Sequence, residues 1–207
     1  MTIWEKTKVL ILNDDDGLVT DMFKKRGTIT TTIITGSDIT SSFISLFDFI
    51  VLTGGTDISP FIYGNERRGE TDVADSKRDV FEVSVIQIAI ANGVGLVGIC
   101  RGAQLLSSHL GGTIDQHDVS GDHLSSHDII LEEKVLGLSV LENYSANHHQ
   151  LFYPPKSMDV IGYNNDVCEI AIHPSYGVLA FQPHPEWEES ESDNQRVFFE
   201  MVKEYCI

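Results

Sequence analysis

Cys100 is the residue whose setting best suits nucleophilic chemistry. It follows the apolar run at residues 95–99, and a helical pattern begins directly after it. Gly98 and Gly102 stand two residues to either side, which is typical of the strained strand-to-helix turn that exposes a nucleophile. The start of a helix also favours the thiolate, the reactive form of cysteine. The alternative is a buried structural cysteine, and this is the role we expect for the other two cysteines.

A thiol nucleophile needs a general base, and residues 181–187 (FQPHPEW) offer one. His184 could take the thiol proton, while Glu186 could accept a hydrogen bond from the other ring nitrogen and fix its tautomer. Prolines at positions 183 and 185 stiffen the segment, which suits residues that must keep a fixed geometry. The alternative is a loop in which His184 and Glu186 face solvent. The turn at Cys100 upstream favours the catalytic interpretation over this alternative.

These two segments resemble the class I glutamine amidotransferase superfamily, whose members use a Cys-His-Glu triad. The matching motifs are Gly98-x-Cys100-x-Gly102-x-Gln104 and His184-Pro185-Glu186. Further segments narrow the resemblance to the γ-glutamyl hydrolase branch, which includes γ-glutamyl-γ-aminobutyrate hydrolases. They are residues 54–60 (GGTDISP), 63–64 (YG), 78–82 (RDVFE), 111–113 (GGT), 148–150 (HHQ) and 184–187 (HPEW). The resemblance covers roughly residues 48–205.

The resemblance implies an oxyanion hole made of backbone amides. In the family, the loop that corresponds to Gly54 and Gly55 forms it together with the amide after the nucleophile, here that of Arg101. Each such donor lowers the reaction barrier by roughly 3–4 kcal/mol. Thr53 stands where the family usually has proline, a departure that a hole built from backbone should tolerate. A tight turn is the alternative interpretation of the glycine pair.

The resemblance also implies residues that bind the substrate. Gln104, one helical turn beyond the nucleophile, would hold the glutamyl portion, and His148 or its backbone would contact the same group. Arg78, Asp79 and Glu82 would border the active site. Alternatively, Arg78 and Glu82 at positions i and i+4 could form only a surface ion pair.

Several histidines raise the question of a metal site. His117, His123 and His127 lie in a polar stretch, and the spacing of the last two would suit a helix. A glycine and three serines among them favour a loop instead. His148 and His149 are adjacent, so their side chains point in different directions. We therefore expect no zinc and, with the resemblance, no cofactor.

The elements that position these residues follow from hydrophobic periodicity. Continuous apolar strands that alternate with helices predict a three-layer, flavodoxin-like α/β domain with a mostly parallel central sheet. Its active site should lie at the carboxyl ends of the strands. No repeat or linker appears, so we expect one domain over residues 1–207. Strands are predicted at residues 8–13, 29–35, 47–53, 95–99, 128–132, 159–162, 169–173 and 177–182, and helices at 75–92, from 101 to the glycines at 111–112, and at 193–205.

Charge and cysteine content limit the partners and the compartment. The chain has 207 residues with 14 Lys plus Arg against 31 Asp plus Glu, a formal net charge of −17. An acidic surface repels phosphate backbones and anionic lipids, so we expect neither a nucleic-acid nor a membrane partner. Cys100, Cys168 and Cys206 are too scattered for a disulfide framework. We expect neither a signal peptide nor a membrane helix, since no long apolar run stands near the first residues or elsewhere in the sequence. A cytoplasmic location is the resulting expectation.

With the resemblance, the sequence implies a cysteine hydrolase that cleaves a small-molecule γ-glutamyl amide through a γ-glutamyl thioester. The alternative is a glutaminase subunit that passes ammonia to a synthetase partner. A non-enzymatic scaffold is disfavoured because Cys100, His184 and Glu186 are all present. Both a homodimer and a synthetase complex are compatible with the sequence.

Overall fold

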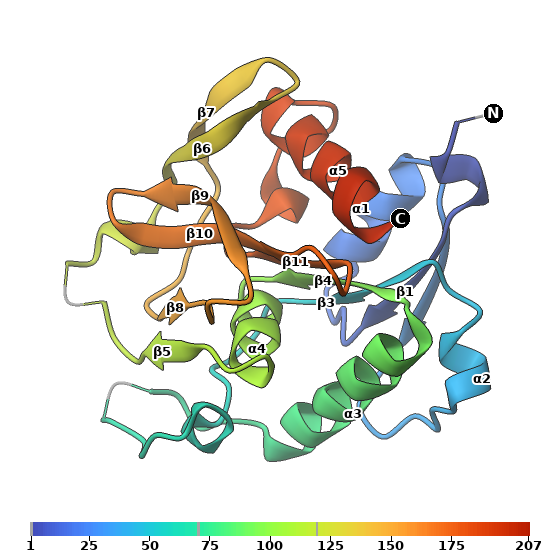
Figure 1. Cartoon of the computed structure of the whole chain (residues 1–207), viewed down its shortest axis with the longest axis horizontal. Coiled ribbons are helices and arrows are strands. Elements are labelled where there is room, and N and C mark those ends of the chain that lie inside the picture. The colour runs from blue at the N-terminus through green and yellow to red at the C-terminus, as the bar shows by residue number, and fades with distance from the viewer. Residues whose placement is uncertain (1, 70, 119) are drawn as a thin grey trace.

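A nine-stranded sheet forms the centre of the computed structural model, which describes residues 2–69, 71–118 and 120–207 (Figure 1). Five strands run parallel, side by side in the order β2-β1-β3-β4-β11. All residues of β3, β4 and β11 are buried, which explains why these strands are continuous apolar runs in the sequence. The bounds of the five are β1 (Lys8–Leu12), β2 (Ile29–Ile33), β3 (Phe49–Leu52), β4 (Gly95–Ile99) and β11 (Val178–Phe181).

Antiparallel strands extend this sheet beyond β11 in the order β10-β9-β6-β7. A separate small sheet pairs two further strands, β5 and β8. The predicted three-layer α/β class is confirmed, and β5, β7 and β8 add to the predicted strands. The bounds are β5 (Thr113–Asp115), β6 (His127–Val135), β7 (Leu138–Tyr144), β8 (Leu151–Tyr153), β9 (Asp159–Asn164) and β10 (Val167–His173).

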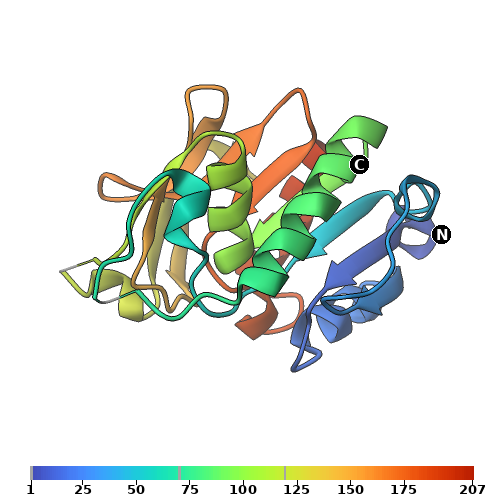
Figure 2. The same ribbon diagram turned by 90° about the horizontal axis from the view of Figure 1, so that it is seen from below.

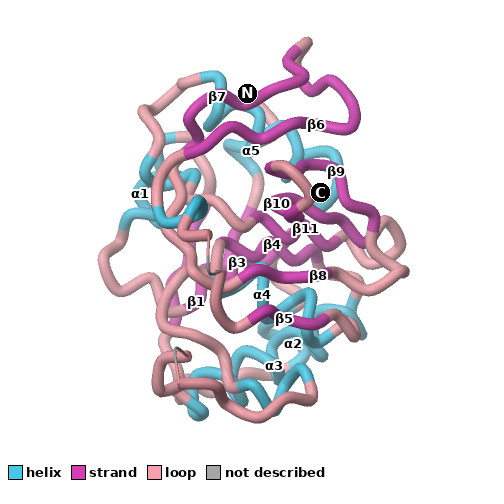
Figure 3. Tube along the Cα trace, turned by 90° about the vertical axis from the view of Figure 1, so that its left-hand side faces the viewer, coloured by secondary structure: helices cyan, strands magenta, loops and turns pink. Residues whose placement is uncertain are grey.

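Helices cover both faces of the sheet (Figures 2 and 3). α1 (Leu18–Lys25) and α5 (Asp193–Cys206) lie on one face, whereas α3 (Ser76–Asn92) and α4 (Arg101–His109) lie on the other, with α2 (Ser41–Ile44) beside α3. Both α1 and α2 add to the predicted helices. Four short 3-10 turns complete the elements: η1 (Trp4–Lys6), η2 (Pro60–Tyr63), η3 (Asp122–Leu124) and η4 (Pro185–Trp187). Over the described ranges, none of the helices combines the length and apolar character that crossing a membrane requires.

Side chains of the parallel strands alternate between two cores. In β1, Val9 and Ile11 enter the core beneath α1 and α5, while Leu10 and Leu12 enter the core beneath α3 and α4. The helix α3 ends as predicted at Gly93, whose φ of 66° is the left-handed conformation that favours glycine.

The carboxyl ends of three parallel strands meet at one edge of the sheet. β3 leads into Thr53, β4 into Cys100 and β11 into Gln182. Because neighbouring parallel strands end at the same edge, the loops that follow them converge there. This edge therefore holds the motifs that the sequence singled out.

Candidate active site

Cys100 occupies a strained turn between β4 and α4. Its φ of 50° and ψ of −108° lie where non-glycine residues are rarely found, a conformation that costs on the order of 1–3 kcal/mol. Its amide donates to the carbonyl of Phe181 at 2.9 Å, which fixes the turn to β11. A Cβ on Gly98 would collide with the backbone of Gly102, and one on Gly102 would collide with the carbonyl of Leu52. Both glycines are thus required for the turn.

His184 lies against this turn at the start of η4. Its Nδ1 is 2.6 Å from Oε1 of Glu186, and its amide donates to the carbonyl of Ser145 at 2.8 Å. A Cβ built on Gly54 would lie 3.2 Å from Cε1 of His184 and 3.8 Å from the Cβ of Cys100. The structure therefore brings Cys100, His184, Glu186 and Gly54 together.

The proton affinity of His184 reflects this setting. Burial lowers the pKa of its imidazole, but the neighbouring sulfur of Cys100 and the carboxylate of Glu186 outweigh that effect and raise it to about 10. The raised pKa favours the protonated ring, the form that can give a proton to a leaving group.

Trp187 is a site residue to which the sequence analysis gave no role of its own. Its indole stacks on the imidazole of His184, with ring centroids 3.7 Å apart and planes 7° apart. Such stacking fixes the orientation of the imidazole and favours its cationic form. Its position directly after the His-Pro-Glu motif is the signal that sequence reasoning could have used.

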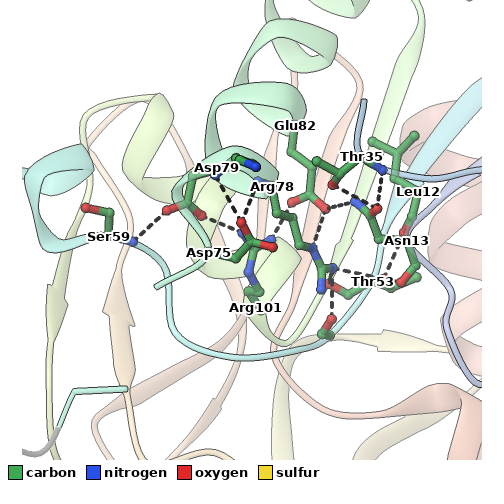
Figure 4. Close-up of polar contacts among 12 residues, drawn as sticks. Leu12, Asn13, Thr35, Thr53, Ser59, Asp75, Arg78, Asp79, Glu82 and Arg101 are labelled. Carbon is green, nitrogen blue, oxygen red and sulfur yellow. Dashed lines mark hydrogen bonds and ion pairs between the residues drawn. The ribbon is translucent and has the colours of Figure 1, made fainter. Parts of the chain in front are cut away.

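Arg78 anchors the glycine loop, as Figure 4 shows. Its Nη2 donates to the carbonyl oxygens of Gly54 at 2.9 Å and Thr53 at 3.2 Å, and to Oγ1 of Thr53 at 3.1 Å. Gly55 has a φ of 147°, and a Cβ there would lie 2.5 Å from Nη1 of Arg78. This guanidinium therefore needs glycine at position 55.

A buried charge network joins α3 to the Cys100 turn (Figure 4). The Arg101 guanidinium pairs with Glu82 and, at 2.5 Å, with Asp79. Glu82 also accepts from Nε of Arg78 and from Nδ2 of Asn13, each at 2.8 Å. Since Glu82 is fully buried and Arg78 is 9% exposed, the alternative of a surface ion pair is wrong. The side chain of Arg101 points into this network, so only its backbone remains available as the expected oxyanion donor.

A cavity of about 230 Å³ opens beside His184. Its walls combine the glycine loop, the loop after β1 and the segment around η4. Residues 14–16 are three consecutive aspartates to which the sequence analysis gave no role, and they contribute to this cavity. The lining residues are Asn13, Asp14, Asp15, Asp16, Val19, Thr53, Gly54, Gly55, Arg78, His184, Glu186 and Trp187.

Gln104 and His148 are both buried and lie outside the lining of this cavity. The side-chain nitrogen Nε2 of Gln104 is 3.5 Å from the carbonyl oxygen of Gln150 and 3.4 Å from Oε1 of Gln182. Nδ1 of His148 lies 3.1 Å from the same Gln150 carbonyl. The structure thus brings these two residues together around Gln150, and their contact with a substrate stays a prediction.

Among the residues that the structure describes, two groups of side chains could hold a metal ion. His123, His127 and Glu169 form a buried group, and His148 lies on the other oxygen of the same carboxylate. A more exposed group comprises Asp57, Asp72 and His149. As predicted, the adjacent His148 and His149 point in different directions, toward Glu169 and Asp57 respectively.

Comparisons with known proteins identify relatives of the sequence. The sequence model of the Peptidase C26 family matches residues 19–186. YvdE of Lactococcus lactis subsp. lactis (strain IL1403), named as a glutamine amidotransferase-like protein, is 35% identical over 74% of this chain and 73% of its own. The gamma-glutamyl-gamma-aminobutyrate hydrolase PuuD of Escherichia coli (strain K12) is 26% identical over 74% of this chain and 69% of its own.

The fold likewise has solved counterparts. A Thermoplasma acidophilum protein described as belonging to GMP synthase superimposes with a TM-score of 0.71 over 96% of this chain and 95% of its own. At 18% identity this likeness concerns the fold alone. The family match and the relatives together lead to one assignment: the chain belongs to the peptidase C26 family of class I glutamine amidotransferase-like hydrolases.

Proposed function

We propose that the protein hydrolyses a γ-glutamyl amide to glutamate and a free amine, with Cys100 as nucleophile, His184 as general acid and base, and Glu186 as the residue that orients His184. One observation carries the proposal: a single imidazole contacts a thiol on one side and a carboxylate, at 2.6 Å, on the other. The similarity to a relative named as a γ-glutamyl-γ-aminobutyrate hydrolase supports the choice of bond.

The first half of the reaction transfers the glutamyl group to the enzyme. The Cys100 thiolate attacks the γ-carbonyl carbon, and negative charge develops on the carbonyl oxygen. Backbone amides of Gly54, Gly55 and Arg101 would stabilise that oxyanion. When the C–N bond breaks, the His184 imidazolium gives its proton to the departing amine, and a γ-glutamyl thioester remains on the sulfur.

The second half releases glutamate. The imidazole of His184, now neutral, takes a proton from a water molecule as that water attacks the thioester carbon. The C–S bond then breaks, and the thiolate is restored beside the imidazolium. Gln104 would hold the glutamyl portion, and His148 or its backbone would contact the same group, as the resemblance implies.

A glutaminase subunit is the second candidate because it would use the same residues. The fold of this chain matches a protein described as a subunit of GMP synthase. Such a subunit would accept glutamine and pass ammonia to a synthetase partner. A free-standing hydrolase would instead act as a monomer or homodimer on its own small-molecule substrate.

Amine release from a panel of γ-glutamyl amides and from free glutamine tests the proposal. Purified protein should release an amine from a γ-glutamyl amide faster than ammonia from glutamine, and acid-quenched enzyme should carry a glutamyl group on Cys100 by mass spectrometry. The Cys100→Ala variant should lose both signals, whereas Cys168→Ala should keep them. Glutaminase activity that appears only when a synthetase is added would favour the second candidate.

A further inference from the structure

Three histidines surround one buried carboxylate behind the Cys100 site. His123 comes from η3, His127 from the start of β6 and His148 from the loop before β8, while Glu169 projects from β10. The Glu169 side chain is fully buried, and those of the histidines are 4%, 10% and 1% exposed in chain order. No Lys or Arg pairs with Glu169 among the described residues.

The contact made by Nδ1, the nitrogen on the side of each ring away from Glu169, fixes the tautomer of that ring. Nδ1 of His127 lies 3.0 Å from the carbonyl of Ser125, and Nδ1 of His148 lies 3.1 Å from the carbonyl of Gln150. Carbonyl oxygens only accept hydrogen bonds, so both Nδ1 atoms carry the proton. Nδ1 of His123 likewise faces the Asp118 carboxylate at 2.8 Å.

In a neutral ring of this tautomer, Nε2 carries no proton and acts as a hydrogen-bond acceptor. Each Nε2 faces a carboxylate oxygen of Glu169, which is also an acceptor. The Nε2 atoms of His123, His127 and His148 and both oxygens of Glu169 are buried and lack hydrogen-bond partners within the described part of the chain. Lone pairs directed at lone pairs in a buried site are unfavourable unless a proton or a metal ion lies between them.

The distances indicate what kind of cation fits. Nε2 of His123 and of His127 lie 3.6 and 3.3 Å from Oε1 of Glu169, and Nε2 of His148 lies 3.5 Å from Oε2. These separations exceed the ~2.7–3.2 Å of a good hydrogen bond. A tetrahedral ion with ligands at ~2.0–2.1 Å separates neighbouring ligand atoms by roughly 3.3–3.4 Å. The distances from Oε1 to the Nε2 atoms of His123 and His127 are close to this value, and the ligand atoms of these three residues all lie within 4.8 Å of one another.

We propose that this cluster binds a zinc ion, with Nε2 of His123, Nε2 of His127 and Oε1 of Glu169 as three ligands, while His148 lies on Oε2 of the same carboxylate. Imidazole and carboxylate are both zinc ligands. The Asp118–His123 contact matches the carboxylate–histidine–zinc arrangement that orients metal-binding histidines. The two positive charges of zinc would be balanced by the carboxylates of Glu169 and Asp118. This proposal replaces the sequence expectation that the histidines bind no metal.

We assign the site a structural role, since its ligands are largely buried and none of them lines the cavity beside His184. It would tie together η3, β6, β10 and the loop at residues 145–150. The same loop contacts residues of the candidate active site. The Ser145 carbonyl accepts a hydrogen bond from the backbone amide of His184, and the Gln150 carbonyl lies 3.5 Å from the side-chain nitrogen Nε2 of Gln104. Bound zinc would therefore hold the wall beside His184 in place.

Metal analysis of the full-length, untagged protein tests the proposal without reference to activity. After incubation with zinc and desalting, the wild type should hold about one zinc ion per chain. Removal of zinc by a chelator should lower Tm by about 5–10 °C, and added zinc should restore it. Cobalt added to the metal-free protein should give the intense visible absorption of a tetrahedral site.

Single substitutions then identify the ligands. His127→Gln and Glu169→Gln should each reduce zinc affinity by at least about 10-fold, and Asp118→Asn by about 10–100-fold. The matched control is His149→Gln. His149 follows His148 in the sequence but belongs to the more exposed group with Asp57 and Asp72, so this variant should retain the zinc.

Two results would overturn the proposal. In the first, the zinc-incubated wild type holds no zinc and its Tm does not respond to chelator, in which case protons rather than a metal hold the cluster together. In the second, His149→Gln loses the metal while His127→Gln and Glu169→Gln retain it, which assigns the ion to the exposed group instead. Because the wild-type measurements need no substitution, a variant that fails to fold leaves the test intact.

Discussion

The indole of Trp187 lies flat on the imidazole of His184, 3.7 Å from centroid to centroid. Glu186, between them in the sequence, holds Nδ1 of the same imidazole at 2.6 Å. Two residues of one 3-10 turn thus restrain the ring in different ways: Trp187 stacks on its plane, and Glu186 holds its Nδ1 atom. Because Trp187 is 45% exposed, its position is better explained by this contact than by packing in the core.

Loss of the stacked indole should weaken catalysis without unfolding the protein. Trp187→Leu removes a cation–π contact of about 1–2 kcal/mol, so we expect kcat/KM to fall by about 5–30-fold. Trp187→Phe keeps a flat ring and should recover most of the activity. Steady-state kinetics with circular dichroism as a folding control checks this, and an unchanged kcat/KM in Trp187→Leu would contradict it.

Glu186→Gln should leave the fold intact and lower kcat by about 10²–10⁴-fold. The amide can no longer stabilise the imidazolium of His184 that forms in each half of the reaction. Glu189→Gln, a neighbouring exposed carboxylate, is the matched control and should behave like wild type. Equal rates for the two variants would remove Glu186 from the proposed mechanism.

The motifs around Cys100 and His184 could be predicted because their constraints are local. The glycines at 98 and 102 meet backbone atoms of the same strand-turn-helix unit and of the adjacent strand β3. The buried strands β3, β4 and β11 are apolar at every position, and their length of four or five residues favours a buried strand over a helix. Parallel strands then brought the loops to one edge without further information.

The cluster around Glu169 could not be predicted in the same way. It depends on how β6, β9 and β10 pair. The ladder between β9 and β10 shifts register between Cys168 and Ile170, where Glu169 lies, and again between Ile170 and Ala171. Such a shift redirects a side chain in a manner that alternation alone does not reveal. Burial was the other missing quantity: the spacing of Arg78 and Glu82 is the same in a surface pair and in the buried network observed here.

His184 should keep its proton well above neutral pH. Its pKa is raised to about 10, whereas an imidazole in the unfolded chain titrates near about 6.5. A group whose pKa rises on folding contributes stability that is complete below the unfolded pKa and disappears as the pH passes the folded one. Relative to His184→Gln, the wild-type free energy of unfolding should thus decline between about pH 6.5 and 10.

Nuclear magnetic resonance of the His184 ring provides the direct check. The native ring should titrate near pH 10, and in Cys100→Ala its pKa should fall because the sulfur no longer stabilises the imidazolium. A native ring that titrates near pH 6.5, or one indifferent to loss of the sulfur, would contradict the proposed thiolate–imidazolium pair.

Cys100 should be alkylated at least about 10-fold faster than the other cysteines at pH 7. All three thiols are between 6% and 8% exposed, so exposure alone does not distinguish them. Burial raises the pKa of Cys168 and of Cys206 well above the ordinary range, which keeps both as unreactive thiols. Mass mapping after brief alkylation checks this, and a label found first on Cys168 or Cys206 would remove the distinction claimed for Cys100.

Glu82→Ala should destabilise the protein by about 3–5 kcal/mol, because it leaves Arg78 and Arg101 without their shared carboxylate in a buried site. Arg196→Ala is the control: it breaks an ion pair with Asp193 whose partners are 49% and 68% exposed, so its effect on stability should stay below about 1 kcal/mol. Urea unfolding at neutral pH measures both.

Since Arg78 also holds the carbonyl of Gly54, Glu82→Ala should in addition slow turnover under conditions in which the variant is still folded. A variant that is destabilised but turns over at the wild-type rate would show that the network supports the fold alone, and equal stability of the two variants would show that the buried pairs contribute no more than an exposed one.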